Sequence, residues 1–113
     1  MEIKDQDYRV WYEADTATIF FQGFLGLDGS EAYKPVLNEM LEVVGTLAKV
    51  VLDLQELEFL NSSGISMLST FVVSMRKRGD IELSLKGSEK ILWQTRSLKN
   101  LQRLMPSLVL EFV

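Results

Sequence analysis

The chain has 113 residues, of which 47% are hydrophobic, and a formal net charge of −4 from 12 basic and 16 acidic residues. This length and hydrophobic content suit one small domain whose core needs no disulfide or metal to hold it together. An acidic balance argues against nucleic-acid binding, which requires clustered Lys and Arg to neutralise phosphates. The chain contains neither His nor Cys, so the usual general base, the thiolate nucleophile and the common zinc ligands are missing.

The sequence gives no sign of a membrane protein. No stretch approaches the roughly 18 uninterrupted apolar residues of a transmembrane helix. The segment Met1–Asp7 is polar and acidic, unlike the start of a secretory signal peptide. We therefore expect a cytoplasmic protein that does not insert into a membrane.

The first part of the chain predicts a hairpin followed by a helix. Residues 9–12 and 18–21 are rich in β-branched and aromatic side chains and flank a polar turn, which is typical of a β-hairpin. An irregular loop follows, marked by Gly23, Gly26 and Gly29. The next helix is expected to begin at Ser30 or, because Pro35 removes a backbone donor from its early turns, nearer Lys34.

The rest of the chain alternates strands and helices. The predicted elements are a buried strand over 50–54, a helix over 64–78, a strand over 81–85, a helix over 89–104 with a break at Ser97, and a last strand over 108–113. The core-facing side chains of the helix over 64–78 are Ile65, Leu68, Phe71, Val72 and Met75. This succession predicts a single α/β domain over 1–113, in which a mixed β-sheet contains an N-terminal hairpin and helices pack on it.

Residues 57–65, Leu-Glu-Phe-Leu-Asn-Ser-Ser-Gly-Ile, join the buried strand to the following helix. The free backbone N–H groups of a helix start favour negative charge, so a phosphate on a serine there would be held. A simpler interpretation is available from residues and spacing alone. Asn61, Ser62 and Ser63 are each good N-caps, and capping by itself explains their presence at a helix start.

The same stretch resembles the signature loop of the STAS domain, whose best-known members are bacterial anti-sigma factor antagonists. The family pattern is an apolar strand, a Phe, and Asp-Ser-Ser-Gly-Ile or Asp-Ser-Ser-Gly-Leu at the start of a helix. Asn61, Ser62 and Gly64 belong to this motif, with Asn61 where the family usually has Asp. The resemblance implies that Ser63 is phosphorylated by a partner anti-sigma factor, a serine kinase of the histidine-kinase-like ATPase type, and that a phosphatase removes the phosphate.

The helix after the motif predicts a contact surface. At about 100° per residue, a row of small hydroxyl side chains and one Met falls away from the core-facing side. The row consists of Ser66, Met67, Thr70 and Ser74. A face of this kind is weakly hydrated, so another protein can pack on it; the alternative is that the hydroxyl groups only keep the helix soluble.

We therefore expect a non-enzymatic regulatory module without cofactor or metal, which binds a protein partner and releases it when Ser63 is phosphorylated. Two alternatives stay open. The first is a constitutive STAS adaptor, because Asn61 cannot steer a Mg²⁺-bound nucleotide as an Asp could. The second is a ligand-binding or transport-accessory STAS domain. A Ser-nucleophile enzyme is a remote third, since the chain has no His.

Overall fold

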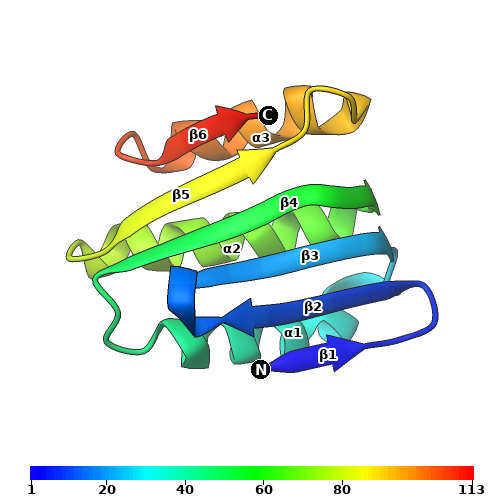
Figure 1. Cartoon of the computed structure of the whole chain (residues 1–113), viewed down its shortest axis with the longest axis horizontal. Helices are drawn as coiled ribbons and strands as arrows, with labels where there is room; N and C mark the ends of the chain where they lie inside the picture. The colour runs from blue at the N-terminus through cyan, green and yellow to red at the C-terminus, as the bar shows by residue number, and fades with distance from the viewer.

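Six strands form one β-sheet in the computed structural model, which describes all residues from Met1 to Val113 (Figure 1). The strands are β1 (Glu2–Lys4), β2 (Tyr8–Glu13), β3 (Thr18–Leu25), β4 (Lys49–Leu60), β5 (Glu82–Gly87) and β6 (Val109–Phe112). The helices are α1 (Gly29–Val44), α2 (Ser62–Arg78) and α3 (Leu92–Leu104), together with the short 3₁₀ turn η1 (Ala14–Thr16).

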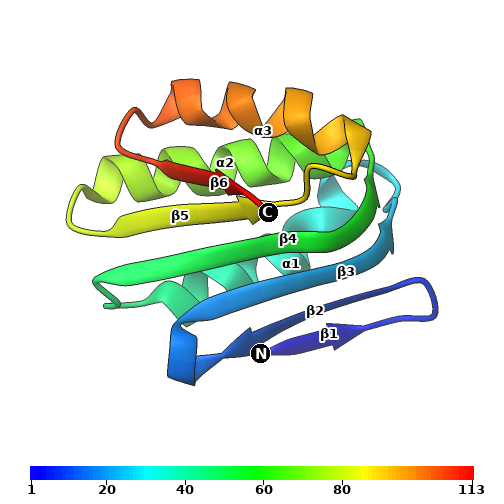
Figure 2. The same ribbon diagram turned by 45° about the horizontal axis from the view of Figure 1, so that its top comes forward.

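The strands lie in the sheet in the same order as in the chain. β1, β2 and β3 pair antiparallel, and the pairs β3–β4, β4–β5 and β5–β6 are parallel. Each parallel connection contains one helix. Because such crossovers are right-handed, successive steps in one direction put all three helices on the same face of the sheet. Figure 2 shows this helical layer, in which α2 lies between α1 and α3.

The core fills the space between the sheet and this layer. β4 supplies its centre with Val50, Leu52 and Leu54, whose side chains are fully buried, as the alternation of a half-covered strand requires. The opposite face of the sheet carries no helix. There, Trp11 and Phe20 stack with ring centroids 5.1 Å apart, which shields part of the uncovered surface from water.

The predicted fold class is confirmed: an α/β fold with a mixed sheet, an N-terminal hairpin and helices packed on the sheet. One strand was missed. β1 has only three residues, and its one inward-facing apolar side chain, Ile3, is too little signal for a strand prediction.

The larger differences from the predicted elements are in α1, α3 and β4. α1 begins at Gly29 and continues through Pro35, whose ring is exposed, while Tyr33 and Val36 on the other side of the helix are buried. α3 continues through Ser97 without a break. β4 runs six residues further than predicted, to Leu60, and this extension brings the strand directly to the start of α2.

Candidate functional site

A single residue, Asn61, separates β4 from α2. It is the N-cap of the helix: its side-chain Oδ1 accepts the Gly64 N–H at 3.0 Å, and its carbonyl oxygen accepts the Ile65 N–H at 3.0 Å. Ser62 and Ser63 therefore belong to the first helical turn, where Ser62 is exposed and Ser63 is half-buried. Of the three N-cap candidates, the structure assigns the cap to Asn61.

The Asn61 side chain also binds two segments far away in the sequence. Its Nδ2 donates to the carbonyl oxygen of Leu27, on the connection between β3 and α1, at 2.7 Å. Its Oδ1 accepts the hydroxyl of Tyr33, on α1, at 2.5 Å. The Tyr33 oxygen in turn accepts the Leu27 N–H at 3.2 Å and lies 3.1 Å from the carbonyl oxygen of Leu25. Asn61 thus ties together the end of β3, α1 and the start of α2.

Tyr33 stays protonated at neutral pH and can act as the donor in this network. Burial raises the pKa of its hydroxyl above the ordinary value, the hydrogen bond with the Leu27 N–H lowers it in part, and Tyr8 raises it further by repulsion once both phenols ionise. Sequence reasoning did not identify Tyr33. The sequence feature that could have indicated it is a tyrosine on the apolar side of a predicted helix. A buried phenol needs a polar partner for its hydroxyl, so such a tyrosine indicates a hydrogen-bond network.

Gly64 is required by close packing at the same junction. A Cβ atom at this position would lie 2.8 Å from Cγ of Leu60 and 2.8 Å from the Tyr33 hydroxyl oxygen, which is closer than carbon and oxygen atoms approach without displacement. The glycine of the motif therefore allows α2 to start directly against the end of β4 and against Tyr33.

Ser63 lies on the wall of a shallow groove of about 240 Å³ between α1 and α2. The groove is lined by Ser30, Tyr33, Lys34, Leu37, Ser63, Ser66, Met67 and Thr70. Neither Ser62 nor Ser63 forms a side-chain hydrogen bond within the chain, and the Gly64 N–H of the first turn is accepted by Asn61. Lys34 is the one cationic side chain of the groove, and its Nζ lies 3.0 Å from a carboxylate oxygen of Glu31.

The predicted contact row on α2 is only partly exposed. Ser66 and Thr70 face solvent, and Ser74 is half-buried. The hydroxyls of Thr70 and Ser74 donate to helix carbonyl oxygens four residues earlier, at 3.1 and 3.0 Å. Since these hydroxyls already have partners, a contacting protein would displace little tightly bound water from them.

The prediction for Met67 is wrong. Its side chain is only 5% exposed and belongs to the hydrophobic core, because α1 packs against α2 on that side. The buried residues of α2 are Gly64, Met67, Leu68, Phe71, Val72 and Met75. The buried side of α2 therefore faces α1 more than predicted. Ile65, which was predicted to face the core, is only half-buried.

Two exposed aromatic side chains near the junction were also missed as surface features. Phe24 on β3 and Phe59 on β4 are 54% and 46% exposed and are partners in the parallel pairing of the two strands. The pairing shifts its register between Gly23, which has a positive φ, and Phe24. The feature of the sequence that could have indicated these exposed side chains is a glycine next to an aromatic residue near a strand end. Exposed aromatic side chains are enriched in protein interfaces.

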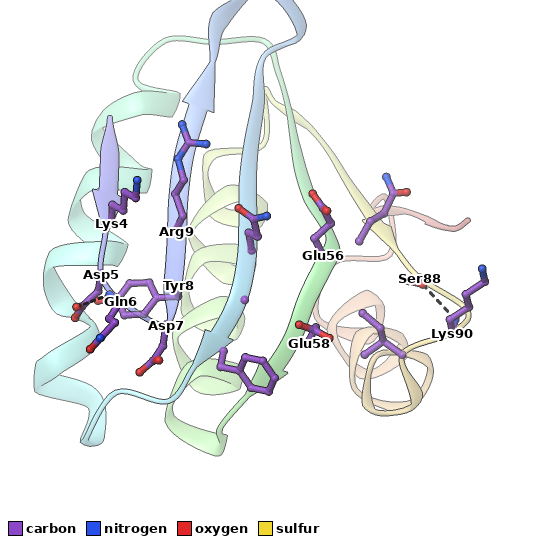
Figure 3. Close-up of a pocket in the computed structure, with 15 residues that line it drawn as sticks. Lys4, Asp5, Gln6, Asp7, Tyr8, Arg9, Glu56, Glu58, Ser88 and Lys90 are labelled. Atoms are coloured by element: carbon purple, nitrogen blue, oxygen red, sulfur yellow. Dashed lines mark hydrogen bonds between the residues drawn. The ribbon is translucent and has the colours of Figure 1, made fainter.

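The helix-free face of the sheet carries a wider, mostly polar hollow of about 840 Å³. Figure 3 shows Glu56 and Glu58 on β4, with Asp5 and Asp7 on the β1–β2 side and Lys90 on the other. No group of three His, Cys, Asp or Glu side chains in the structure is arranged to hold a metal ion. None of the three helices combines the length and apolarity that a membrane crossing needs.

Comparisons with known proteins agree on the fold. The family model of the STAS domain matches residues 9–107. No curated protein sequence matches the chain. Among solved structures, the chain is similar to SiaC in the crystal structure of the diguanylate cyclase SiaD in complex with its activator SiaC from Pseudomonas aeruginosa. The TM-score is 0.73 at 14% sequence identity, and the match covers 100% of this chain and 99% of that chain.

Proposed function

The chain belongs to the STAS domain family, and on that premise we propose that it is a regulatory module without catalytic activity. It binds a protein partner through the surface around the start of α2 and is released when Ser63 is phosphorylated. The surface consists of Ser63, Ser66, Thr70 and Ser74, with the α1 side of the groove beside them.

The observation that carries this proposal is the division of roles between Asn61 and Ser63. The cap of α2 is made by Asn61, so the Ser63 hydroxyl is not needed to stabilise the helix. Ser63 nevertheless lies in the first turn, where unpaired N–H groups and the helix dipole favour an anion. A phosphate on Ser63 can therefore be accommodated without unfolding the helix.

Charge explains how such a phosphate would act on a partner. It adds about −1.5 to −2 charges at neutral pH, at the centre of a face that is otherwise uncharged except for the ion pair of Lys34 and Glu31. A partner that packs on neutral hydroxyl groups would then have to bury an unpaired dianion, which is strongly unfavourable. Lys34, the one cationic side chain that lines the groove with Ser63, is the candidate to bind the phosphate in the released protein.

The partner that this proposal favours is a cytoplasmic anti-sigma factor with serine kinase activity, and a phosphatase resets the switch. The likeness to SiaC widens the class of possible partners, because SiaC is described as the activator of an enzyme with which it forms a complex. The exposed Phe24 and Phe59 lie at the same end of the sheet, with Phe24 beside the hollow on its helix-free face, and offer apolar area to a partner that extends around this end.

A constitutive adaptor is the second candidate, and one observation favours it. Position 61 holds an amide whose oxygen accepts two hydrogen bonds and whose nitrogen donates one within the domain, so there is no acidic side chain here to help a kinase place its Mg²⁺-bound nucleotide. In this case the domain would bind its partner in one state only, and Ser63 would remain unmodified.

The test is incubation of the purified protein with a serine kinase encoded beside it and ATP, followed by phosphopeptide mapping by mass spectrometry. We expect one phosphate on Ser63, which is lost in Ser63→Ala. Ser62→Ala is the matched control, because it removes the neighbouring hydroxyl of the same helical turn, and it should leave phosphorylation intact. If the wild-type protein accepts no phosphate while still binding its partner, the constitutive adaptor replaces the switch.

A further inference from the structure

The side chain at position 61 occupies a site with a fixed pattern of donors and acceptors. On one side, two donors point at Oδ1: the Gly64 N–H at 3.0 Å and the Tyr33 hydroxyl at 2.5 Å. On the other side, the carbonyl oxygen of Leu27 accepts from Nδ2 at 2.7 Å. Only a group with an acceptor and a donor on the same planar carbon satisfies both sides, and among side chains of this length the Asn amide is the one that has this pattern at neutral pH.

A carboxylate would fit the space but not the pattern. Its second oxygen would lie against the Leu27 carbonyl oxygen, and two acceptors at that distance repel each other. No cation takes part in the network, and Tyr33 is the one titratable side chain in it. Of the charged residues next to these partners in the chain, Asp28 is acidic, and the one cation, Lys34, is paired with Glu31.

We infer that Tyr33 is a positioning residue for the segment around Ser63, that it acts through the Asn61 side chain, and that this site accepts an amide but not a carboxylate. Tyr33 as a residue is 1% exposed, and its hydroxyl bridges the Leu27 N–H and the Asn61 Oδ1. The β3–α1 connection and the first turn of α2 are therefore held as one unit. The purpose of this unit, to present Ser63 in a fixed place, rests on the proposed function.

The first test is the pH profile of stability of Asn61→Asp, measured by urea unfolding between pH 4 and pH 8. In the folded state, partial burial and the Leu27 carbonyl oxygen raise the pKa of the new carboxyl group, whereas the Gly64 N–H, the Tyr33 hydroxyl and the dipole of α2 lower it. We expect the first effect to be the larger, so that the pKa rises. Its protonated form can donate to Leu27 as the amide does. The free energy of unfolding of Asn61→Asp is therefore closest to that of wild type at low pH and falls below it as the pH rises through this raised pKa.

At pH 8 we expect the ratio of unfolded to folded protein to increase about ten- to a hundredfold over wild type, the usual effect of an unsatisfied buried polar group. This difference should shrink steadily toward pH 4. Asn100→Asp is the matched control, since it makes the same chemical change on the exposed side of α3, and its difference from wild type should be small throughout. An Asn61→Asp protein as stable as wild type at pH 8, or a difference independent of pH, would overturn the inference.

The second test addresses Tyr33 itself and uses hydrogen exchange of single amides, followed by NMR. Tyr33→Phe keeps the ring in the core and removes only the hydroxyl. Exchange of the Leu27 and Gly64 amides should accelerate about tenfold or more, whereas that of Leu85 in the middle of β5 should follow global stability. Equal changes at all three amides would contradict a positioning role. Neither test uses a kinase or a partner, so their outcome is independent of whether Ser63 is phosphorylated.

Discussion

Two helix starts in this domain are organised by a buried or half-buried amide side chain, and they differ in what lies around it. At the start of α3, Gln94 is fully buried: its Nε2 donates to the carbonyl oxygens of Leu54 and Leu57 at 2.6 and 2.9 Å, and its Oε1 accepts the Ser88 N–H at 2.8 Å. At the start of α2, Asn61 makes a comparable set of bonds but is half-buried and stands beside two free serine hydroxyls.

A glycine makes room for the network at each start. A Cβ atom at Gly87 would lie 2.9 Å from Oε1 of Gln94, as one at Gly64 would lie 2.8 Å from the Tyr33 hydroxyl. The Gln94 network is closed within the core and connects β4 to β5 and α3. The Asn61 network connects segments that reach the surface. We infer that the same chemistry stabilises only the packing of β4, β5 and α3 at Gln94, whereas at Asn61 it also fixes a surface around Ser63.

The largest effect expected from this comparison is at Gln94. Gln94→Leu keeps the volume approximately but leaves two buried carbonyl oxygens and the Ser88 N–H without their partner. We expect the free energy of unfolding to fall by about 2–4 kcal/mol, since each buried unsatisfied group costs about 1–3 kcal/mol, as measured by urea unfolding. Gln102→Leu, which removes one hydrogen bond from an exposed residue, should cost much less; similar losses in both variants would argue against a special role for Gln94.

A smaller effect on stability, but a clear one on binding, is expected on the exposed side of α2. Thr70→Lys should change the free energy of unfolding by no more than about 0.5 kcal/mol, as at ordinary surface sites, and should weaken binding of the partner in a direct titration. Lys77 lies on the same helix, one turn or more from the groove, and Lys77→Thr serves as the control for a charge change on α2. Full partner affinity in Thr70→Lys would exclude this side of α2 from the interface.

Most of the architecture could be predicted from the sequence because the strands and helices have clear periodicity. Alternating apolar residues identify β5, and the motif identifies the start of α2. The C-terminal half of β4 could not be recognised. Its buried residues Leu54, Leu57 and Leu60 are spaced by three, because the pairing with β3 is irregular there, and this spacing is unlike that of a strand.

The candidate site was only partly predictable for a related reason. Asn61, Ser63 and Gly64 are adjacent in the sequence and could be identified together. The bonds of Asn61 to Tyr33 and Leu27 join residues 28 and 34 positions apart, and no local pattern reports them. The burial of Met67 depends on which helix packs beside α2, and the periodicity of α2 alone does not contain that information.

The central claim is that Asn61 holds the start of α2 and leaves Ser63 free for modification. It is tested most directly by comparing the urea unfolding of Asn61→Ala and Ser63→Ala with that of the wild-type protein. We predict that Asn61→Ala lowers the free energy of unfolding by about 1–2 kcal/mol or more, as expected for loss of an N-cap, and that Ser63→Ala changes it by less than about 0.5 kcal/mol. A Ser63→Ala variant as destabilised as Asn61→Ala would contradict the claim, because Ser63 would then be part of the cap.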